Sequence, residues 1–115
     1  RTAAVSAGWV ALYQALRWAK QHELLEGKIE MTRVAAVSAG IWQGQTLLDL
    51  TYEEDSSSEF DLNLVFNDRG EIIEVQGTAE HAPIAPEKLQ QLVALGFRGV
   101  NRIMEEQQKC VESMR

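Results

Sequence analysis

The sequence has few cysteines, prolines and histidines: one, two and two among 115 residues. Its single cysteine, Cys110, has no second cysteine to pair with, which excludes disulfide-stapled scaffolds and cysteine zinc clusters and favours a reducing compartment. No apolar run approaches the roughly 18 residues that a transmembrane helix needs, and no signal-peptide pattern opens the chain. We therefore expect a soluble, cytoplasmic protein without a membrane partner.

Basic residues are also in short supply. Eleven bases against 17 acids give a net charge of -6 and a pI near 4.9. Since nucleic-acid phosphates are held chiefly by Lys and Arg, this balance taken alone argues against a nucleic-acid surface. The excess is local, because the stretch from Asp49 to Asp61 holds six acids and no base. Such a cluster repels itself unless it is solvated, screened or neutralised by a cation.

Apolar residues make up 45% of the chain, which suits one globular domain and excludes disorder. Two segments show helical periodicity. The first covers 3–22, with Thr2 available as N-cap and a stripe of Val5, Trp9, Leu12, Leu16 and Ala19. The second opens at Pro86, and its stripe is Leu89, Leu92, Val93, Phe97, Val100 and Met104. Gly96 and Gly99 fall inside that helix and predict a close approach of another backbone.

The middle of the chain has the pattern of strands. An apolar run over 34–42, the pair Gln43-Gly44 and a second run over 45–52 predict a hairpin. Residues 60–67 alternate apolar and polar, and the turn over 67–70 leads into a returning strand, which predicts a second hairpin. Gly77 indicates a bulge or a close approach of the backbone to a ligand, and the bulge is favoured.

The order of these elements predicts an α+β fold. Two β-hairpins would form a four-stranded, mainly antiparallel sheet covered by two helices, and we expect both helices on one face.

The acidic stretch is the first candidate for chemistry. Asp49 and Asp55 would lie about 20 Å apart in an extended chain, but the Glu-rich and Ser-rich segment between and after them favours a bend. Carboxylates that converge at a strand end can bind Mg²⁺, although a solvated acidic loop is the more common outcome of such a pattern. Asp61 is expected to face solvent or to pair across the sheet.

The remaining candidate residues carry little signal. His22 stands at a helix end and His81 precedes a loop, and no triad, HExxH run or phosphate loop accompanies them. The three tryptophans fall within the expected elements and are more typical of core or interface positions than of base stacking. They are Trp9, Trp18 and Trp42.

Four segments together resemble the bacterial ribonuclease PH family, in the same order and over essentially all 115 residues. They are Arg1-Thr2-Ala3-Ala4-Val5, Val34 to Ile41, Leu47 to Ser56, and Glu74-Val75-Gln76-Gly77-Thr78-Ala79-Glu80. The resemblance implies that 1–115 is the C-terminal half of a ribonuclease PH domain, with the ribonuclease PH half-fold. The N-terminal half would then precede Arg1.

The resemblance also implies an activity. The family contains phosphorolytic 3′ to 5′ exoribonucleases, or tRNA nucleotidyltransferases, which trim the 3′ ends of tRNA precursors and other RNA with inorganic phosphate and release nucleoside diphosphates. The implied cofactor is Mg²⁺ or Mn²⁺, and the implied assembly is a homo-hexamer built as a trimer of dimers. Arg1 matches the arginine of the family's Gly-Thr-Arg phosphate run. Asp49 and Asp55 match its paired, catalytic metal-binding aspartates, whereas Thr51 stands where many relatives carry another Asp.

Two alternatives stay open. One is a non-catalytic ring or scaffold subunit of the same fold, and the other is an unrelated acidic module that binds a cation without needing phosphate. The residues encoded before Arg1 would discriminate between the enzyme and these alternatives, since a Gly-Gly-Thr there supports the enzyme. We expect the 115 residues alone to be inactive, because the first half of the family's fold supplies another phosphate-contacting arginine.

Overall fold

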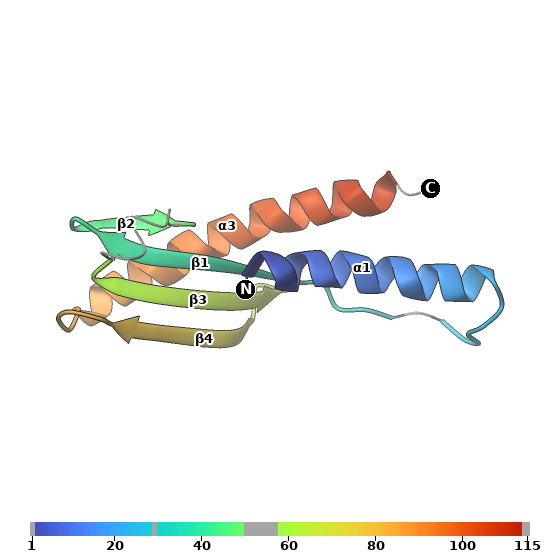
Figure 1. Ribbon diagram of the computed structural model, residues 1–115, viewed down its shortest axis with the longest axis horizontal. Coiled ribbons are helices and arrows are strands. Elements are labelled where there is room, and N and C mark those ends of the chain that lie inside the picture. Colours follow the sequence, from blue (N-terminus) through green and yellow to red (C-terminus); the bar gives the residue numbers. More distant parts are fainter. Residues whose placement is uncertain (1, 29, 50–57, 114–115) are drawn as a thin grey trace.

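A computed structural model describes residues 2–28, 30–49 and 58–113 as one antiparallel sheet and two helices. The elements follow the predicted order: α1 (Thr2–Gln21), β1 (Val34–Trp42), β2 (Gln45–Leu48), β3 (Phe60–Asn67), β4 (Ile72–Ala79) and α3 (Pro86–Glu112). The sheet order is β2-β1-β3-β4, so β1 and β3 are central (Figure 1). This confirms the predicted fold class. Neither described helix has the length and apolarity to cross a membrane.

Both predicted hairpin turns are present. Gln43 and Gly44 have φ values of 49° and 78° between the paired residues Trp42 and Gln45, which is the left-handed backbone that a two-residue hairpin needs. In the second turn, the Oδ1 atom of Asn67 accepts the backbone N–H groups of the second and fourth residues after it. β2 is shorter than predicted and ends at Leu48. Residues 50–57 lie outside the described part of the chain.

The core lies between the sheet and α3. Alternate residues of β1 and β3 point toward this helix, as period-two burial predicts. A Cβ atom added to Gly96 would lie 2.4 Å from Leu64 Cδ1, and one added to Gly99 would lie 2.9 Å from Leu48 Cδ1. A close approach is present at both glycines, but the atoms that approach are side chains of the sheet rather than the predicted second backbone.

The prediction of a bulge at Gly77 is wrong. Gly77 pairs regularly with Leu62, and the irregularity between β3 and β4 lies instead at Val65 and Phe66. A Cβ on Gly77 would come within 2.9 Å of Leu62 Cδ1 and Phe60 Cζ. The glycine thus makes room for side chains of the neighbouring strand.

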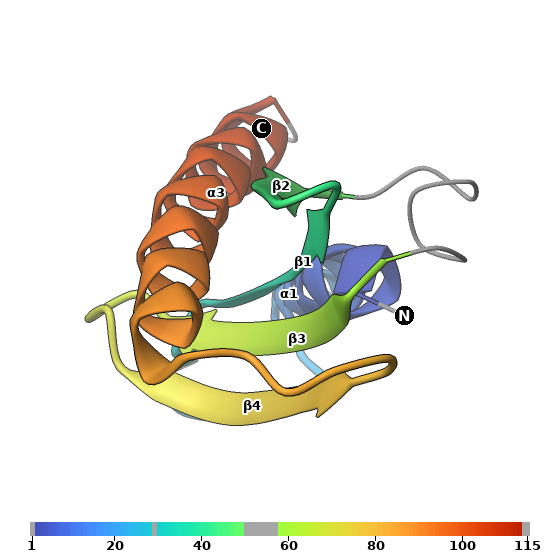
Figure 2. The same cartoon turned by 90° about the vertical axis from the view of Figure 1, so that its left-hand side faces the viewer.

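Of the two described helices, α3 covers a face of the sheet, whereas α1 docks on the edge of β1 that β2 leaves uncovered and is hydrogen-bonded to α3, so the prediction that both cover one face is also wrong. Figure 2 shows α3 over one face of the strands and the start of α1 beside β1. Thr2 is itself helical rather than an N-cap. Twenty helical residues span about 30 Å, so α1 runs past the sheet in Figure 1. Trp9 is buried, whereas Leu12 and Trp18 are 53% and 54% exposed.

Trp9 anchors the connector that follows α1. Its indole N–H donates to the Thr32 carbonyl at 3.0 Å, and the guanidinium carbon of Arg33 lies 4.9 Å from the centre of its ring. The ring of Tyr13 stacks on the same indole at 5.5 Å between ring centroids. Through these contacts one buried aromatic holds the end of the connector against the helix just before β1 begins.

The packing of α3 gives a first prediction. Gly96→Ala should lower the free energy of unfolding by about 1–3 kcal/mol, because its methyl group overlaps the fully buried Leu64. Gly8→Ala is the matched control: nothing lies within 4 Å of its Cβ position, so the better helix propensity should stabilise the protein by roughly 0.5–1 kcal/mol. Urea unfolding of both variants measures the difference. A stabilised Gly96→Ala protein would contradict the close packing of α3.

Candidate functional site

Asp49 directly follows the edge strand β2 and has an unusual backbone. Its φ is 51°, in the left-handed region that few residues other than glycine adopt, although aspartate tolerates it better than most. Its N–H donates to the Ser38 carbonyl of β1 at 2.9 Å. Its side chain is exposed. The backbone is therefore fixed on β1 while the carboxylate stays accessible.

The start of α1 is fixed to the same edge of β1. Ser6 Oγ accepts the N–H of Ala36 at 3.1 Å, two residues before Ser38. Residues two apart in a strand point their backbone polar groups to the same edge and lie about 6.5 Å apart. β2 pairs with β1 only from Ala39 onward, so α1 binds the part of this edge that β2 leaves unpaired. Asp49 and the first turns of α1, far apart in sequence, thus meet along one strand.

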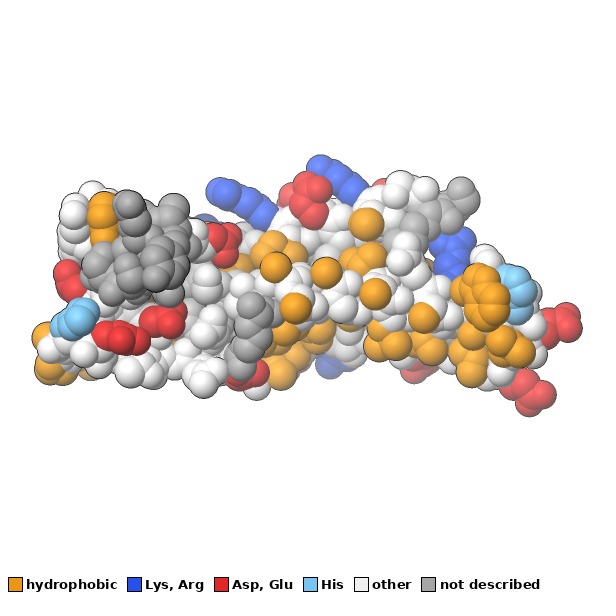
Figure 3. Space-filling view, viewed as in Figure 1, with side chains coloured by type: hydrophobic (Ala, Val, Ile, Leu, Met, Phe, Trp, Pro, Cys, Tyr) orange, Lys and Arg blue, Asp and Glu red, His pale blue; other side chains and the backbone are white. Residues whose placement is uncertain are grey.

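The sheet face opposite α3 is polar where the site lies. A hollow of about 200 Å³ on this face is lined by Asp61, Asn63, Gln76, Gly77 and Thr78. Asp61 is half-buried and lies across from Gly40 and Thr78, in agreement with its predicted place on the polar face of β3. Figure 3 shows this face of β3 and β4 as largely polar with acidic side chains at one end.

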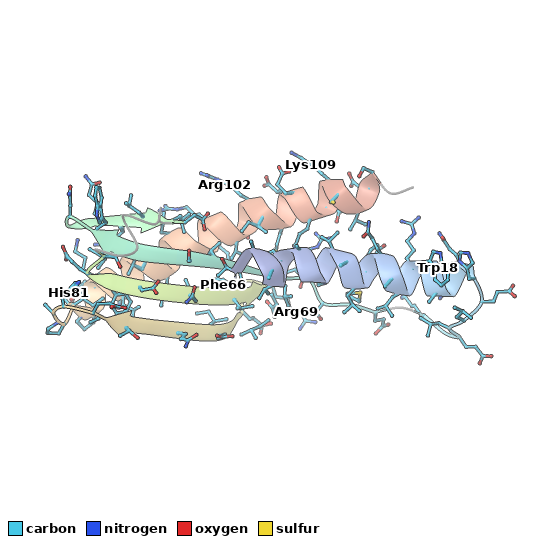
Figure 4. All side chains as sticks on the ribbon, in the orientation of Figure 1. Trp18, Phe66, Arg69, His81, Arg102 and Lys109 are labelled. Carbon is cyan, nitrogen blue, oxygen red and sulfur yellow. The ribbon has the colours of Figure 1, made fainter. Side chains whose placement is uncertain are left out.

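None of the four strands contains a lysine or an arginine. Among the described residues, the bases labelled in Figure 4 belong to other elements, with Arg69 in the β3–β4 turn and Arg102 and Lys109 on α3. An anion at this sheet face would therefore depend on cations supplied from outside the strands.

The histidines lie far apart and far from a common centre. His22 stacks on Trp18 at 4.0 Å between ring centroids, and its Nδ1 lies 2.9 Å from the Trp18 carbonyl, at the end of α1. His81 follows β4 at the opposite end of the molecule (Figure 4). The two imidazoles cannot act on one substrate atom, which agrees with the absence of a catalytic histidine motif in the sequence.

The other predicted site residues are not described. Arg1 and Asp55 lie outside residues 2–28, 30–49 and 58–113, as does Thr51, where many relatives carry another Asp. Within those ranges no three His, Cys, Asp or Glu side chains come close enough to hold a metal ion. Asp49 is thus the one member of the predicted metal pair whose place in the fold is known.

Sequence reasoning missed two buried polar residues beside this site, Ser6 and Gln107. A signal for the second was available. The apolar stripe of α3 passes through Val100, Met104 and Val111, and helical spacing puts Gln107 on the same face. A polar residue at a position that periodicity marks as buried points to a specific hydrogen-bonding partner.

Comparison with known proteins identifies the family. Residues 32–99 match the model of the 3′ exoribonuclease family, domain 2. The chain is 41% identical over 112 residues to ribonuclease PH of Mesorhizobium japonicum and 42% identical to that of Brucella ovis, covering 96% of this chain in each case. It spans about half the length of these curated relatives, 47% of each.

Solved structures share the fold at low sequence identity. An Archaeoglobus fulgidus exosome with RNA bound to its active site matches 76% of this chain and 35% of its own with a TM-score of 0.59 at 16% identity. An archaeal exosome core matches 78% of this chain and 37% of its own with a TM-score of 0.61 at 15% identity. With the family model matching more than half of its residues, the chain belongs to the 3′ exoribonuclease family, of which it contains domain 2.

Proposed function

We propose that this chain is the metal-binding part of a phosphorolytic 3′ to 5′ exoribonuclease. The enzyme would use inorganic phosphate to remove nucleotides from RNA 3′ ends, tRNA precursors among them, and release nucleoside diphosphates. The proposal combines the family membership with the residues of this chain that match the family's functional positions, Arg1, Asp49 and Asp55.

One observation carries the proposal: a single edge of β1 holds both Asp49 and the start of α1. Asp49 binds the Ser38 carbonyl, and Ser6 binds the N–H of Ala36, two residues away. Arg1 precedes Ser6 by only five residues in the sequence. The fold therefore gives a reason for a phosphate-binding residue before α1 and a metal-binding carboxylate after β2 to serve one reaction.

The donor set suits a hard divalent cation. The Asp49 carboxylate is exposed at a strand end, and carboxylate oxygens are the ligands that Mg²⁺ and Mn²⁺ take up in proteins. In the proposal Asp55 supplies the second carboxylate. A bound Mg²⁺ or Mn²⁺ would polarise the scissile phosphoryl group and stabilise the leaving 3′ oxygen.

Arg1 would bind the attacking phosphate. Phosphate and RNA are both anions, so their mutual repulsion has to be offset before the oxygen of one can reach the phosphorus of the other. A guanidinium binds phosphate through two parallel N–H groups, and the N-terminus of a 20-residue helix adds a favourable dipole. Because the strands carry no basic residue, this arginine and cations beyond the sheet would hold the anions.

Assembly with further protein is part of the proposal. β4 is an edge strand on which Ile72, Ile73 and Val75 are about half exposed, and α1 exposes Leu12 and Trp18 to a similar degree. Apolar surface of this extent is typical of interfaces. It supports a ring-shaped homo-hexamer in which other parts of the protein cover these faces and supply most of the basic RNA path.

The metal pair gives the second prediction. Asp49→Asn and Asp55→Asn, made in the full product of the gene that encodes this chain, should each lower phosphorolysis by roughly 10²-fold or more. Asparagine keeps the shape of the side chain and tolerates the left-handed backbone of Asp49, so the fold should persist. The measurement is nucleoside diphosphate released from a tRNA precursor at saturating Mg²⁺, with and without phosphate.

Asp61→Asn is the matched control for the metal pair, because Asp61 lies on the same polar face of the sheet and is not a proposed ligand. Its activity should stay within about twofold of the wild type, as for substitutions outside the reacting centre. Full turnover by either metal-site variant would exclude the metal assignment. Folded wild-type protein without any phosphate-dependent turnover would favour a scaffold subunit.

Arg1 gives the third prediction. Arg1→Lys keeps the positive charge but loses the two-pronged hydrogen bonding, so the KM for phosphate should rise roughly tenfold, as expected from about 1.5 kcal/mol of lost charge-assisted bonding. The KM for RNA should change much less. Steady-state kinetics with each substrate varied in turn separates the two constants, and an unchanged phosphate KM would remove Arg1 from the site.

A further inference from the structure

Gln107 lies on the buried face of α3, where a polar side chain is uncommon. It is 4% exposed, and the stripe around it is apolar. Its Nε2 group donates to the Ser6 carbonyl at 3.1 Å and to the Val34 carbonyl at 2.9 Å. One side chain therefore joins α3 to both α1 and β1.

The same side chain is not the choice that would maximise stability. Its Oε1 atom is buried with no hydrogen-bond partner, and a buried acceptor without a partner lowers the stability of the fold. An apolar residue would fill this position of the stripe without that cost. What glutamine provides here, and an apolar residue cannot, is the pair of hydrogen bonds from Nε2 that join α3 to α1 and β1.

Ser6 is hydrogen-bonded both to α3 and to the sheet. Its carbonyl accepts from Gln107, and its Oγ accepts the N–H of Ala36 on β1. The described residues between α1 and β1 form no helix or strand, so the chain itself does not fix how α1 sits on the sheet. Contacts such as these fix it.

The hydrogen bonds continue to the candidate site. Ala36 and Ser38 present their polar groups to the same edge of β1, and the Ser38 carbonyl accepts the N–H of Asp49. Gln107 therefore holds α1 at a point two strand residues from the anchor of Asp49. A shift of α1 along this edge would change the distance between Arg1, which precedes α1 in the sequence, and the Asp49 carboxylate.

We propose that Gln107 is a positioning residue, which sets the start of α1 against β1 and so sets the distance between the phosphate-binding and metal-binding parts of the site. This inference rests on the proposed function. Misplacement of reacting groups by about 1 Å can lower turnover by as much as 10²-fold. A residue that contacts neither substrate nor metal can therefore control how well phosphate is used.

The test compares two neighbouring glutamines of α3 in the full gene product. Gln107→Met removes both donated bonds, adds no charge and keeps a similar side-chain length. Gln108→Met is the control, because the Gln108 amide binds Arg33 and Glu112 on the exposed side of the helix. We expect Gln107→Met to raise the KM for phosphate about tenfold with the KM for RNA within twofold, and Gln108→Met to change neither.

Ser6→Ala provides a second variant, in which the high helix propensity of alanine offsets part of the cost of leaving the buried Ala36 N–H without a partner. It removes the acceptor of the Ala36 N–H and should raise the phosphate KM in the same direction. If both variants only lower the melting temperature while the phosphate KM and kcat stay at their wild-type values, Gln107 is a structural residue and the inference is wrong. Wild-type protein without phosphate-dependent turnover would instead remove the proposed function, and with it this role.

Discussion

The docking of α1 and the placement of Asp49 both rely on hydrogen bonds to one backbone edge of β1. A strand inside a fold must satisfy every N–H and C=O along both of its edges, since a buried polar group without a partner costs stability. β3 covers one edge of β1 along its length. On the other edge β2 covers only the last four residues, Ala39 to Trp42, and three groups that precede them bind elsewhere. Asp49 takes one of them and Ser6 another.

Because β2 and α1 share one edge of β1, the start of α1 lies next to Asp49. Had β2 been as long as β1, it would have occupied the positions that α1 uses, and the helix could not have docked there. The short β2 leaves Asp49 at a strand end and α1 beside it. α3 supports the arrangement from one face of the sheet, with Gly96 and Gly99 packed closely on the sheet and Gln107 bonded to α1. The same hydrogen-bonding constraint thus shapes the fold and the candidate site.

The charge of the chain has a place in this arrangement. The net charge of -6 counts against RNA binding when it is treated as a property of the whole surface. The acids concentrate between Asp49 and Asp61, next to the end of β2, and the strands hold no bases. In the proposed enzyme this concentration would serve a metal ion. RNA would then be bound by basic residues outside the sheet, in a protein about twice as long as this chain if it resembles its relatives.

Local sequence patterns were enough to predict the helices and strands and their order. Period-two burial from Phe60 to Phe66, the Gln43-Gly44 turn and the helical stripe after Pro86 depend on local geometry, which the spacing of residues records. The resemblance likewise singled out Asp49 from sequence alone. The edge of the sheet on which α1 packs, the reason for Gly77 and the partners of Gln107 depended on contacts between distant residues. Residue spacing along the chain does not encode those contacts, so they become visible only in the folded protein.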